Sequence, residues 1–173
     1  MAIYQIFNGA TPTTAKFVAV TTGTAIKTLL QVKPSATLVA KIIEWGIRVD
    51  APASAALLVA ELLETDVAAT VTAHVAAGIN KVDAEALRGG DPTTNLIQVG
   101  TTSTGYTASG EGTITAVRLF DSIVQTIPTT NGFEFVKQFP LGREPVLDLG
   151  LFGRIRTHTS VAMNAVCYMT IEV

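Results

Sequence analysis

The chain has 173 residues and a net charge of −2, and 48% of its residues are hydrophobic while only 15% are charged. A chain of this length forms one domain by default and buries about 70% of its unfolded surface, so it builds a core without disulfides. No basic field is available to attract phosphates, so we expect no direct binding to nucleic acid.

The low fraction of charged residues also bears on the surface. Average globular chains carry about 25% charged residues, whereas Thr, Ala, Val and Gly take their place here. Either much of the surface contacts other subunits, or the protein is a β-protein with a Thr-rich exterior. Residues 1–9 lack the basic region and apolar core of a signal peptide, and no run of about 18 apolar residues occurs. We therefore expect synthesis in a cytoplasm and no membrane span.

The N-terminal part of the chain predicts an arm. Residues 3–7 are apolar and end at the turn signal Asn8-Gly9, and the residues that follow are rich in Thr. Such a stretch is typical of a loop or an extended segment. We expect residues 1–15 to form an extended arm and residues 16–173 to form a single domain.

Three strands are expected next, at residues 17–20, 26–32 and 39–49. The third has the clearest alternation, which places its single Trp among apolar residues that we expect to be buried. The residues assigned to this face are Val39, Ile43, Trp45, Ile47 and Val49, interrupted only by Lys41.

Residues 55–64 are ambiguous. Their Ala and Leu content favours a helix by propensity, yet apolar residues on both alternating faces suit a strand that is buried on both sides. We favour the strand because strands are expected on both sides of this segment.

A long loop is expected in the middle of the chain. Residues 68–75 predict a Thr-alternating strand, but residues 76–110 contain many Gly and Thr residues and little periodicity. A helical turn is plausible at residues 83–88, and short pairings are plausible at residues 96–99. A loop of this length in a compact domain is usually functional or ordered by a partner.

The C-terminal part predicts a series of strands joined by turns, with Asn131-Gly132 as a hairpin signal. The last strand is the strongest, because residues 161–173 alternate to the final residue and place Cys167 on the apolar face. We expect this thiol to be buried and inert. The strands expected before it are residues 111–124, 133–139, 145–149 and 154–159.

Together these elements predict an all-β fold. Many short strands with turn signals at regular spacing indicate a sandwich or barrel rather than alternating strands and helices. The predicted architecture is an antiparallel β-sandwich of the jelly-roll type, with about eight strands in two sheets.

The sequence offers no recognisable catalytic or metal-binding motif, so we expect no catalytic residues, no metal, no cofactor and no enzymatic activity. His74 and His158 each occur alone, without the spacing of metal ligands. His74 is predicted to be a surface strand residue, and His158 to be structural. A triad of Ser160, His158 and Asp148 can be assembled only on paper.

One charged cluster has two possible meanings. Arg154 and Arg156 share a strand face, and Arg143-Glu144 lies shortly before them. Because Arg is favoured at interfaces, the cluster is a candidate for an ion-pair strip between subunits. The alternative is a solvated strand face with a local pair to Glu144.

Three segments, read in order, resemble a known family. They are Ile43-Glu44-Trp45-Gly46-Ile47 with residues 57–62, then residues 135–144, then the closing strand. They resemble the small jelly-roll proteins encoded among the head genes of tailed bacteriophages, the capsid decoration or cement proteins. The resemblance implies a sandwich of two four-stranded sheets on the outside of an icosahedral head, often as a homotrimer, that clamps neighbouring major capsid subunits.

This resemblance implies a location on the virion and the major capsid protein as partner. The predicted contacts are the arm, residues 1–15, and the loop at residues 89–110, with the sandwich as a rigid spacer. The alternative is a host- or glycan-binding virion module, such as a head fibre or tail tip domain. For that alternative Tyr106 is the best exposed aromatic candidate, because Trp45 is expected to be buried.

Overall fold

The computed structural model describes residues 2–82 and 96–173, which form strands, connecting loops and one short 3-10 turn. In chain order the elements are β1 (Ile3–Phe7), β2 (Val20–Thr21), β3 (Lys27–Val32), β4 (Ala40–Val49), β5 (Ala56–Thr65), β6 (Thr70–Ala73), η1 (Ala76–Gly78), β7 (Asn80–Lys81), β8 (Gly105–Gly110), β9 (Val117–Ile127), β10 (Phe133–Gln138), β11 (Val146–Leu147), β12 (Phe152–Thr159) and β13 (Asn164–Glu172).

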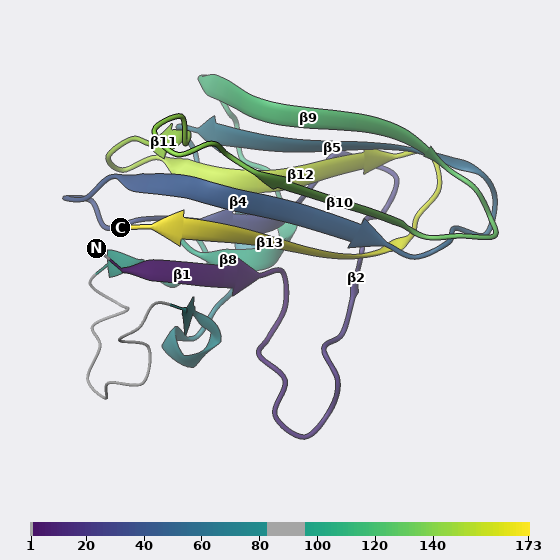
Figure 1. Cartoon of the computed structure of the whole chain (residues 1–173), viewed down its shortest axis with the longest axis horizontal. Helices are drawn as coiled ribbons and strands as arrows, with labels where there is room; N and C mark the ends of the chain where they lie inside the picture. Colours follow the sequence, from purple (N-terminus) through teal and green to yellow (C-terminus); the bar gives the residue numbers. More distant parts are fainter. Residues whose placement is uncertain (1, 83–95) are drawn as a thin grey trace.

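These strands form two antiparallel sheets that face each other across one core (Figure 1). The first sheet has the order β10-β4-β13-β1-β7, with β11 and β2 added to β4 and β13, and the second has the order β6-β8-β3-β12-β5-β9. The prediction of an all-β antiparallel sandwich is confirmed. Within the described residues the strands outnumber the predicted eight or so, because β2, β6, β7 and β11 are short pieces.

The closing strand holds the first sheet together, as its alternation predicts. β13 pairs with β1 on one side and with β4 on the other. Its inward side chains are all buried: Ala165, Cys167, Met169 and Ile171 are each 0% exposed. Burial raises the pKa of the Cys167 thiol, so the thiol stays protonated and unreactive.

β5 is a strand, so the strand that we favoured for this ambiguous segment is confirmed. It pairs along its length with β12 on one side and with β9 on the other. Hydrogen bonds on both edges and burial of Leu58, Ala60 and Leu62 outweigh the helix propensity of its Ala and Leu residues.

The face assignment predicted for β4 is wrong at its start. Ala40 and Ile42 are buried together with Trp45, while Val39 is 49% exposed and Ile43 is half-buried. The pairing of β4 with β13 shifts register between Thr170 and Ile171. A bulge inserts one extra residue, so the side chains before it point to the opposite face.

Trp45 is buried, as predicted, and links the two sheets. Its Nε1 donates a hydrogen bond of 3.0 Å to Oδ2 of Asp121 on β9. The other oxygen of Asp121 lies 2.7 Å from Nζ of Lys137 on β10. One carboxylate of the second sheet therefore binds two strands of the first.

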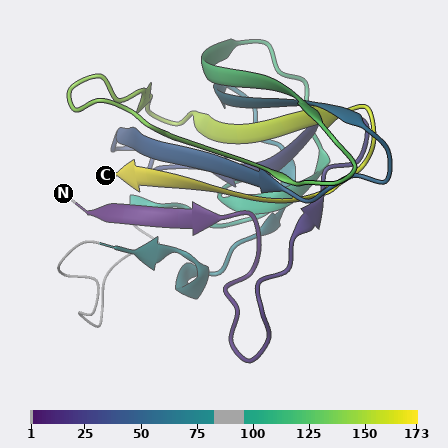
Figure 2. The same cartoon turned by 45° about the vertical axis from the view of Figure 1, so that its right-hand side comes forward.

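The predicted N-terminal arm is corrected, because residues 3–7 form β1 inside the first sheet between β13 and β7. The part that leaves the sandwich is internal: residues 8–19, here called the projecting loop, extend away from the sheets before β2 (Figure 1). The expected strand at residues 17–20 is reduced to β2. Both chain ends lie side by side at one edge of the structure (Figure 2).

The expected long loop at residues 76–110 contains more structure than predicted. It holds η1 and β7, and its last residues form β8 between β3 and β6. Pairings near residues 96–99 are confirmed as isolated bridges, Pro34 with Ile97 and Val99 with Thr104. The helical turn expected at residues 83–88 lies outside the described residues. No helix in the described ranges is long and apolar enough to span a membrane.

Candidate binding groove and projecting loop

The projecting loop runs from β1 to β2, and both of its ends are held against β13. Asn8 is fully buried at its first end, where Nδ2 donates to the Ala165 carbonyl at 3.1 Å and Oδ1 accepts from the Cys167 amide at 2.9 Å. After the loop, β2 pairs with the start of β13, and the Thr22 amide donates to the Met163 carbonyl at 2.9 Å. The loop is therefore held at both ends by the backbone of one central strand.

His74 supports the first end of the loop, and its predicted surface position is wrong. The side chain is only 3% exposed because β1, η1 and β8 surround it. Its Nε2 lies 2.7 Å from the carbonyl oxygen of Phe7. A carbonyl only accepts, so Nε2 carries the proton. The His74 ring also packs on Tyr106, with 4.9 Å between ring centroids, so Tyr106 is part of this packing and not a free loop aromatic.

Burial lowers the pKa of His74, although its hydrogen bond to Phe7 opposes this effect. The folded protein thus resists protonation that the unfolded chain accepts near pH 6.5. His74 contributes its full stability above about pH 6.5, and this contribution falls as the pH drops toward the lower folded pKa.

Between about pH 7 and pH 5 we expect the free energy of unfolding to decrease less in His74→Gln than in the wild type, because Gln does not titrate. Urea unfolding at both pH values measures this. The control is His158→Gln, whose parent side chain is exposed. An equal pH dependence in the wild type and in His74→Gln would contradict the role given to His74.

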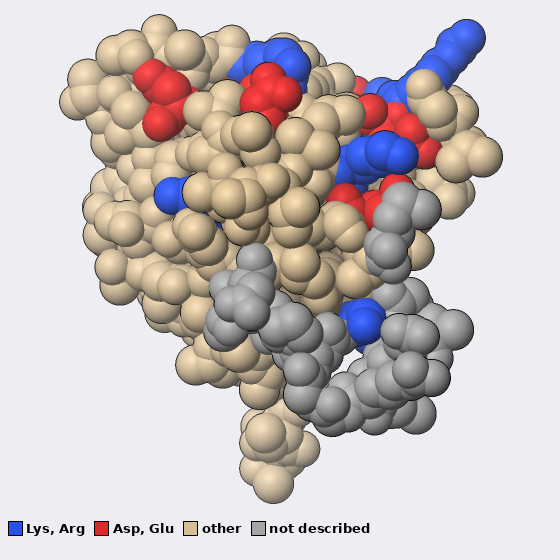
Figure 3. Space-filling model, turned by 90° about the vertical axis from the view of Figure 1, so that its left-hand side faces the viewer, with Lys and Arg blue, Asp and Glu red and all other residues tan. Residues whose placement is uncertain are grey.

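The tip of the loop is exposed and nearly uncharged. Residues 10–16 are all exposed, and Lys16 is the only charged residue of the loop. Val18 is 71% exposed. Figure 3 shows Lys, Arg, Asp and Glu gathered over the upper part of one face, while the lowest projection carries none of these colours in this view.

Phe17 folds back from the loop toward the sheet. Its ring centroid lies 5.8 Å from that of Phe7. A Cβ atom at Gly9 would lie 2.7 Å from the Phe17 ring, so only glycine allows this close contact. The loop is therefore closed at its base by an aromatic pair, and it leaves a space between itself and the sheet.

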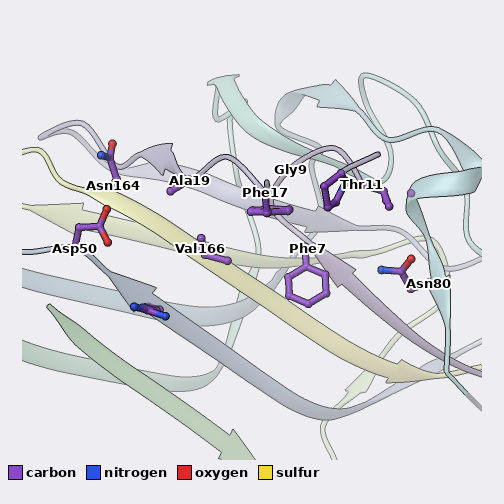
Figure 4. Close-up of a pocket in the computed structure, with 12 residues that line it drawn as sticks. Phe7, Gly9, Thr11, Phe17, Ala19, Asp50, Asn80, Asn164 and Val166 are labelled. Atoms are coloured by element: carbon purple, nitrogen blue, oxygen red, sulfur yellow. The ribbon is translucent and has the colours of Figure 1, made fainter. Parts of the chain in front are cut away.

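That space is a groove of about 450 Å³ on the outer face of the first sheet (Figure 4). Such a volume lies within the range of about 300–1,000 Å³ found for ligand sites. Its lining is mostly apolar, with polar side chains from four separate segments of the chain. The lining residues are Phe7, Gly9, Thr11, Pro12, Phe17, Ala19, Arg48, Asp50, Gly78, Asn80, Asn164 and Val166.

The polar groups lie at the two ends of the groove. Asp50 and Asn164 are neighbours, since the Asp50 amide donates to the Asn164 carbonyl at 2.9 Å. Asn80 lies on β7, beyond β13 and β1. In Figure 4 the two Phe rings lie between these ends. The groove thus crosses three inter-strand spacings, or about 14 Å.

Beside the groove, the Tyr168 ring covers part of the outer face of the first sheet. It lies over Gly46, where a Cβ atom would lie 2.6 Å from the ring. Its hydroxyl donates to Oε1 of Glu44 at 2.6 Å. Burial and this hydrogen bond raise the pKa of Tyr168, so the hydroxyl remains a donor at neutral pH.

The structure does not bring the side chains of Ser160, His158 and Asp148 together as a catalytic triad. Ser160 Oγ accepts from the Leu57 amide at 2.9 Å, and an Asp148 oxygen lies 3.5 Å from Arg118. His158 is exposed on β12, and no hydrogen bond joins these three side chains in the described part of the chain. Over the same residues, no group of three potential metal ligands occurs.

Both interpretations of the Arg cluster are wrong for Arg154. This side chain is 0% exposed, and its Nη1 lies 3.2 Å from Oε2 of Glu111. Nη2 also donates to the Val67 carbonyl. Residues 111–116, expected to be strand, instead form an irregular segment that starts with the partner of Arg154. Arg156 pairs at 2.6 Å with Glu61 on the neighbouring strand β5, within this chain.

Exposed apolar side chains gather on the edge strand β9. Val117, Leu119 and Val124 are 56%, 54% and 65% exposed. β9 pairs only with β5 among the described strands, so its other edge is open. Open edges and exposed apolar groups are typical of surfaces that meet another chain.

Comparison of the sequence with protein-family models and with curated proteins finds no match.

Proposed function

We propose that this protein is a structural virion protein: a capsid decoration, or cement, protein that binds the outside of an icosahedral phage head. Its partner is the major capsid protein, and it acts as a homo-oligomer, with a trimer favoured. The observation that carries the proposal is the projecting loop, which is exposed and almost uncharged and is tied at both ends to the centre of a rigid sheet.

The loop suits a docking role for physical reasons. Anchoring at Asn8 and Thr22 limits the conformational entropy that its residues lose on binding. Its tip presents Thr hydroxyls and Val18 rather than charges, so binding depends little on salt. Weak contacts of this kind are multiplied when many copies, or the subunits of one oligomer, bind one shell.

Two further features support the proposal. Residues 43–47, 57–62 and 135–144 and the closing strand resemble decoration proteins. The exposed apolar side chains of β9 offer a surface for contact between subunits. The gene neighbourhood is an inexpensive check: an adjacent major capsid gene favours this function, whereas an adjacent tail gene favours a host-binding module.

We expect Val18→Asp to weaken capsid binding at least tenfold, because it places a charge in an exposed apolar position that must lose water on docking. The measurement is co-sedimentation of the purified protein with undecorated shells of the major capsid protein encoded in the same phage genome. Deleting residues 2–15 is not a clean test, because it removes β1 from the sheet.

The matched control is Leu149→Asp, an exposed apolar residue in the turn between β11 and β12, 54% exposed. Both variants should retain the unfolding free energy of the wild type within about 0.5 kcal/mol. If Val18→Asp binds shells as tightly as Leu149→Asp, the projecting loop is not the docking element.

A further inference from the structure

The groove beneath the projecting loop has polar side chains without partners. Within the described residues, no hydrogen bond or ion pair joins the side chains of Arg48, Asp50, Asn80 or Asn164 to another group. Arg48 lies near the end of β4 and Asp50 directly follows that strand, yet the two side chains are not paired. Donors and acceptors that converge on a groove without partners are available to a ligand.

The centre of the groove is apolar and aromatic. Phe7 and Phe17 are both half-buried, and Val166 forms part of the floor between them and β4. Two rings held 5.8 Å apart give a rigid apolar surface, which loses little side-chain entropy when a ligand packs on it.

The charges of the groove restrict the class of ligand. One Arg and one Asp cancel, so no net field favours a phosphate or a nucleotide. The remaining polar groups are amides and a hydroxyl, which both donate and accept hydrogen bonds. A neutral ligand with many hydroxyls along its edges and an apolar C–H face fits this arrangement, and saccharides have this chemistry.

We propose that the groove is a saccharide-binding site. A sugar ring packs its C–H face on Phe7 and Phe17, Asp50 accepts hydrogen bonds from hydroxyl groups at one end, and Arg48 and Asn164 donate to sugar oxygens there. Asn80 contacts the next unit of the saccharide at the other end. The groove is partly open to solvent, so it accepts a segment of a longer oligosaccharide. This activity is separate from capsid docking and does not require a shell.

The test uses the purified full chain on an array of neutral, N-acetylated and sialylated oligosaccharides, followed by calorimetric titration with the oligosaccharide that gives the strongest signal. We expect binding to a neutral or N-acetylated oligosaccharide, and at least a tenfold loss of affinity in both Phe17→Ala and Asp50→Ala. The first removes the stacking surface, and the second removes an acceptor of hydroxyl hydrogen bonds.

Two control variants are matched to these changes. Leu149→Ala removes an apolar side chain that is exposed and absent from the groove, and Asn131→Ala removes an exposed amide elsewhere. Both should bind like the wild type. Circular dichroism confirms that every variant is folded.

The proposal is overturned if the folded wild type gives no signal on the array, which is also the result expected of a groove for peptides or nucleotides. It is overturned as well if either Phe17→Ala or Asp50→Ala retains affinity within twofold of the wild type. Because no capsid is present, neither outcome depends on whether the protein decorates phage heads.

Discussion

Glu111→Gln should lower the free energy of unfolding by about 3 kcal/mol, because it leaves the buried Arg154 guanidinium without its counter-charge. Burial already lowers the pKa of Arg154, and Glu111 is the main group that opposes this effect. Glu111 also accepts hydrogen bonds from the amide and hydroxyl of Thr28, at 2.6 and 2.5 Å. Urea unfolding of the variant measures the loss.

The neighbouring pair provides the control. Arg156 on β12 lies opposite Glu61 on β5, but their side chains are 22% and 26% exposed, so water screens their interaction. We expect Glu61→Gln to cost less than about 1 kcal/mol. Equal losses in the two variants would show that the covering segment at residues 111–116 does not exclude water from Arg154.

Deleting residues 170–173 should destabilise the protein by more than about 5 kcal/mol and leave most of the chain unfolded. The deletion removes Ile171, which is fully buried, and the last pairs of β13 with both β1 and β4. It also removes the hydrogen bonds of Val173 with Ala2, at 2.9 and 3.0 Å. Far-ultraviolet circular dichroism during thermal unfolding measures the effect.

Point variants separate packing from chain length. Ile171→Ala keeps the backbone pairs and should cost about 2–5 kcal/mol, since it opens a cavity in the core. Thr170→Ala changes a half-buried side chain on the outer face and should cost less than about 1 kcal/mol. A truncated chain with unchanged stability would contradict the central position of β13.

The sequence predicts the fold class because alternation is a local property. Residues 161–173 keep one apolar face to the end, and the structure buries that face from Met163 to Ile171. The same reasoning fails at Ile42 and Ile43, where the bulge opposite Thr170 reverses the alternation. A bulge depends on the partner strand, and its only trace in the sequence of β4 is Lys41, a charged residue on the face predicted to be buried.

The sequence does not predict the surroundings of isolated polar residues. His74 and Arg154 both lie in segments whose pattern predicts exposed side chains, and both are buried by segments distant in the chain: β1 and β8 for His74, and residues 111–116 for Arg154. A buried polar residue reveals itself only through its partners, and those partners are set by the tertiary structure.

The groove is hidden from sequence reasoning for a similar reason. Its residues come from four segments, around Phe7–Ala19, Arg48–Asp50, Gly78–Asn80 and Asn164–Val166, and no motif connects them. Only the turn signal at Asn8-Gly9 marks the place where the loop leaves the sheet. It indicates a change of direction, but not that Phe17 returns to pack on Phe7.

The first and last residues of the described chain lie side by side, next to the paired strands β1 and β13. Ala2 and Val173 exchange two backbone hydrogen bonds on neighbouring strands, so a linker of a few residues would join them without moving either strand. New ends opened at the exposed tip of the projecting loop would cut no strand pair. In such a circular permutant the sandwich would be unchanged, and the loop would become two free tails whose separate contributions to binding can be measured.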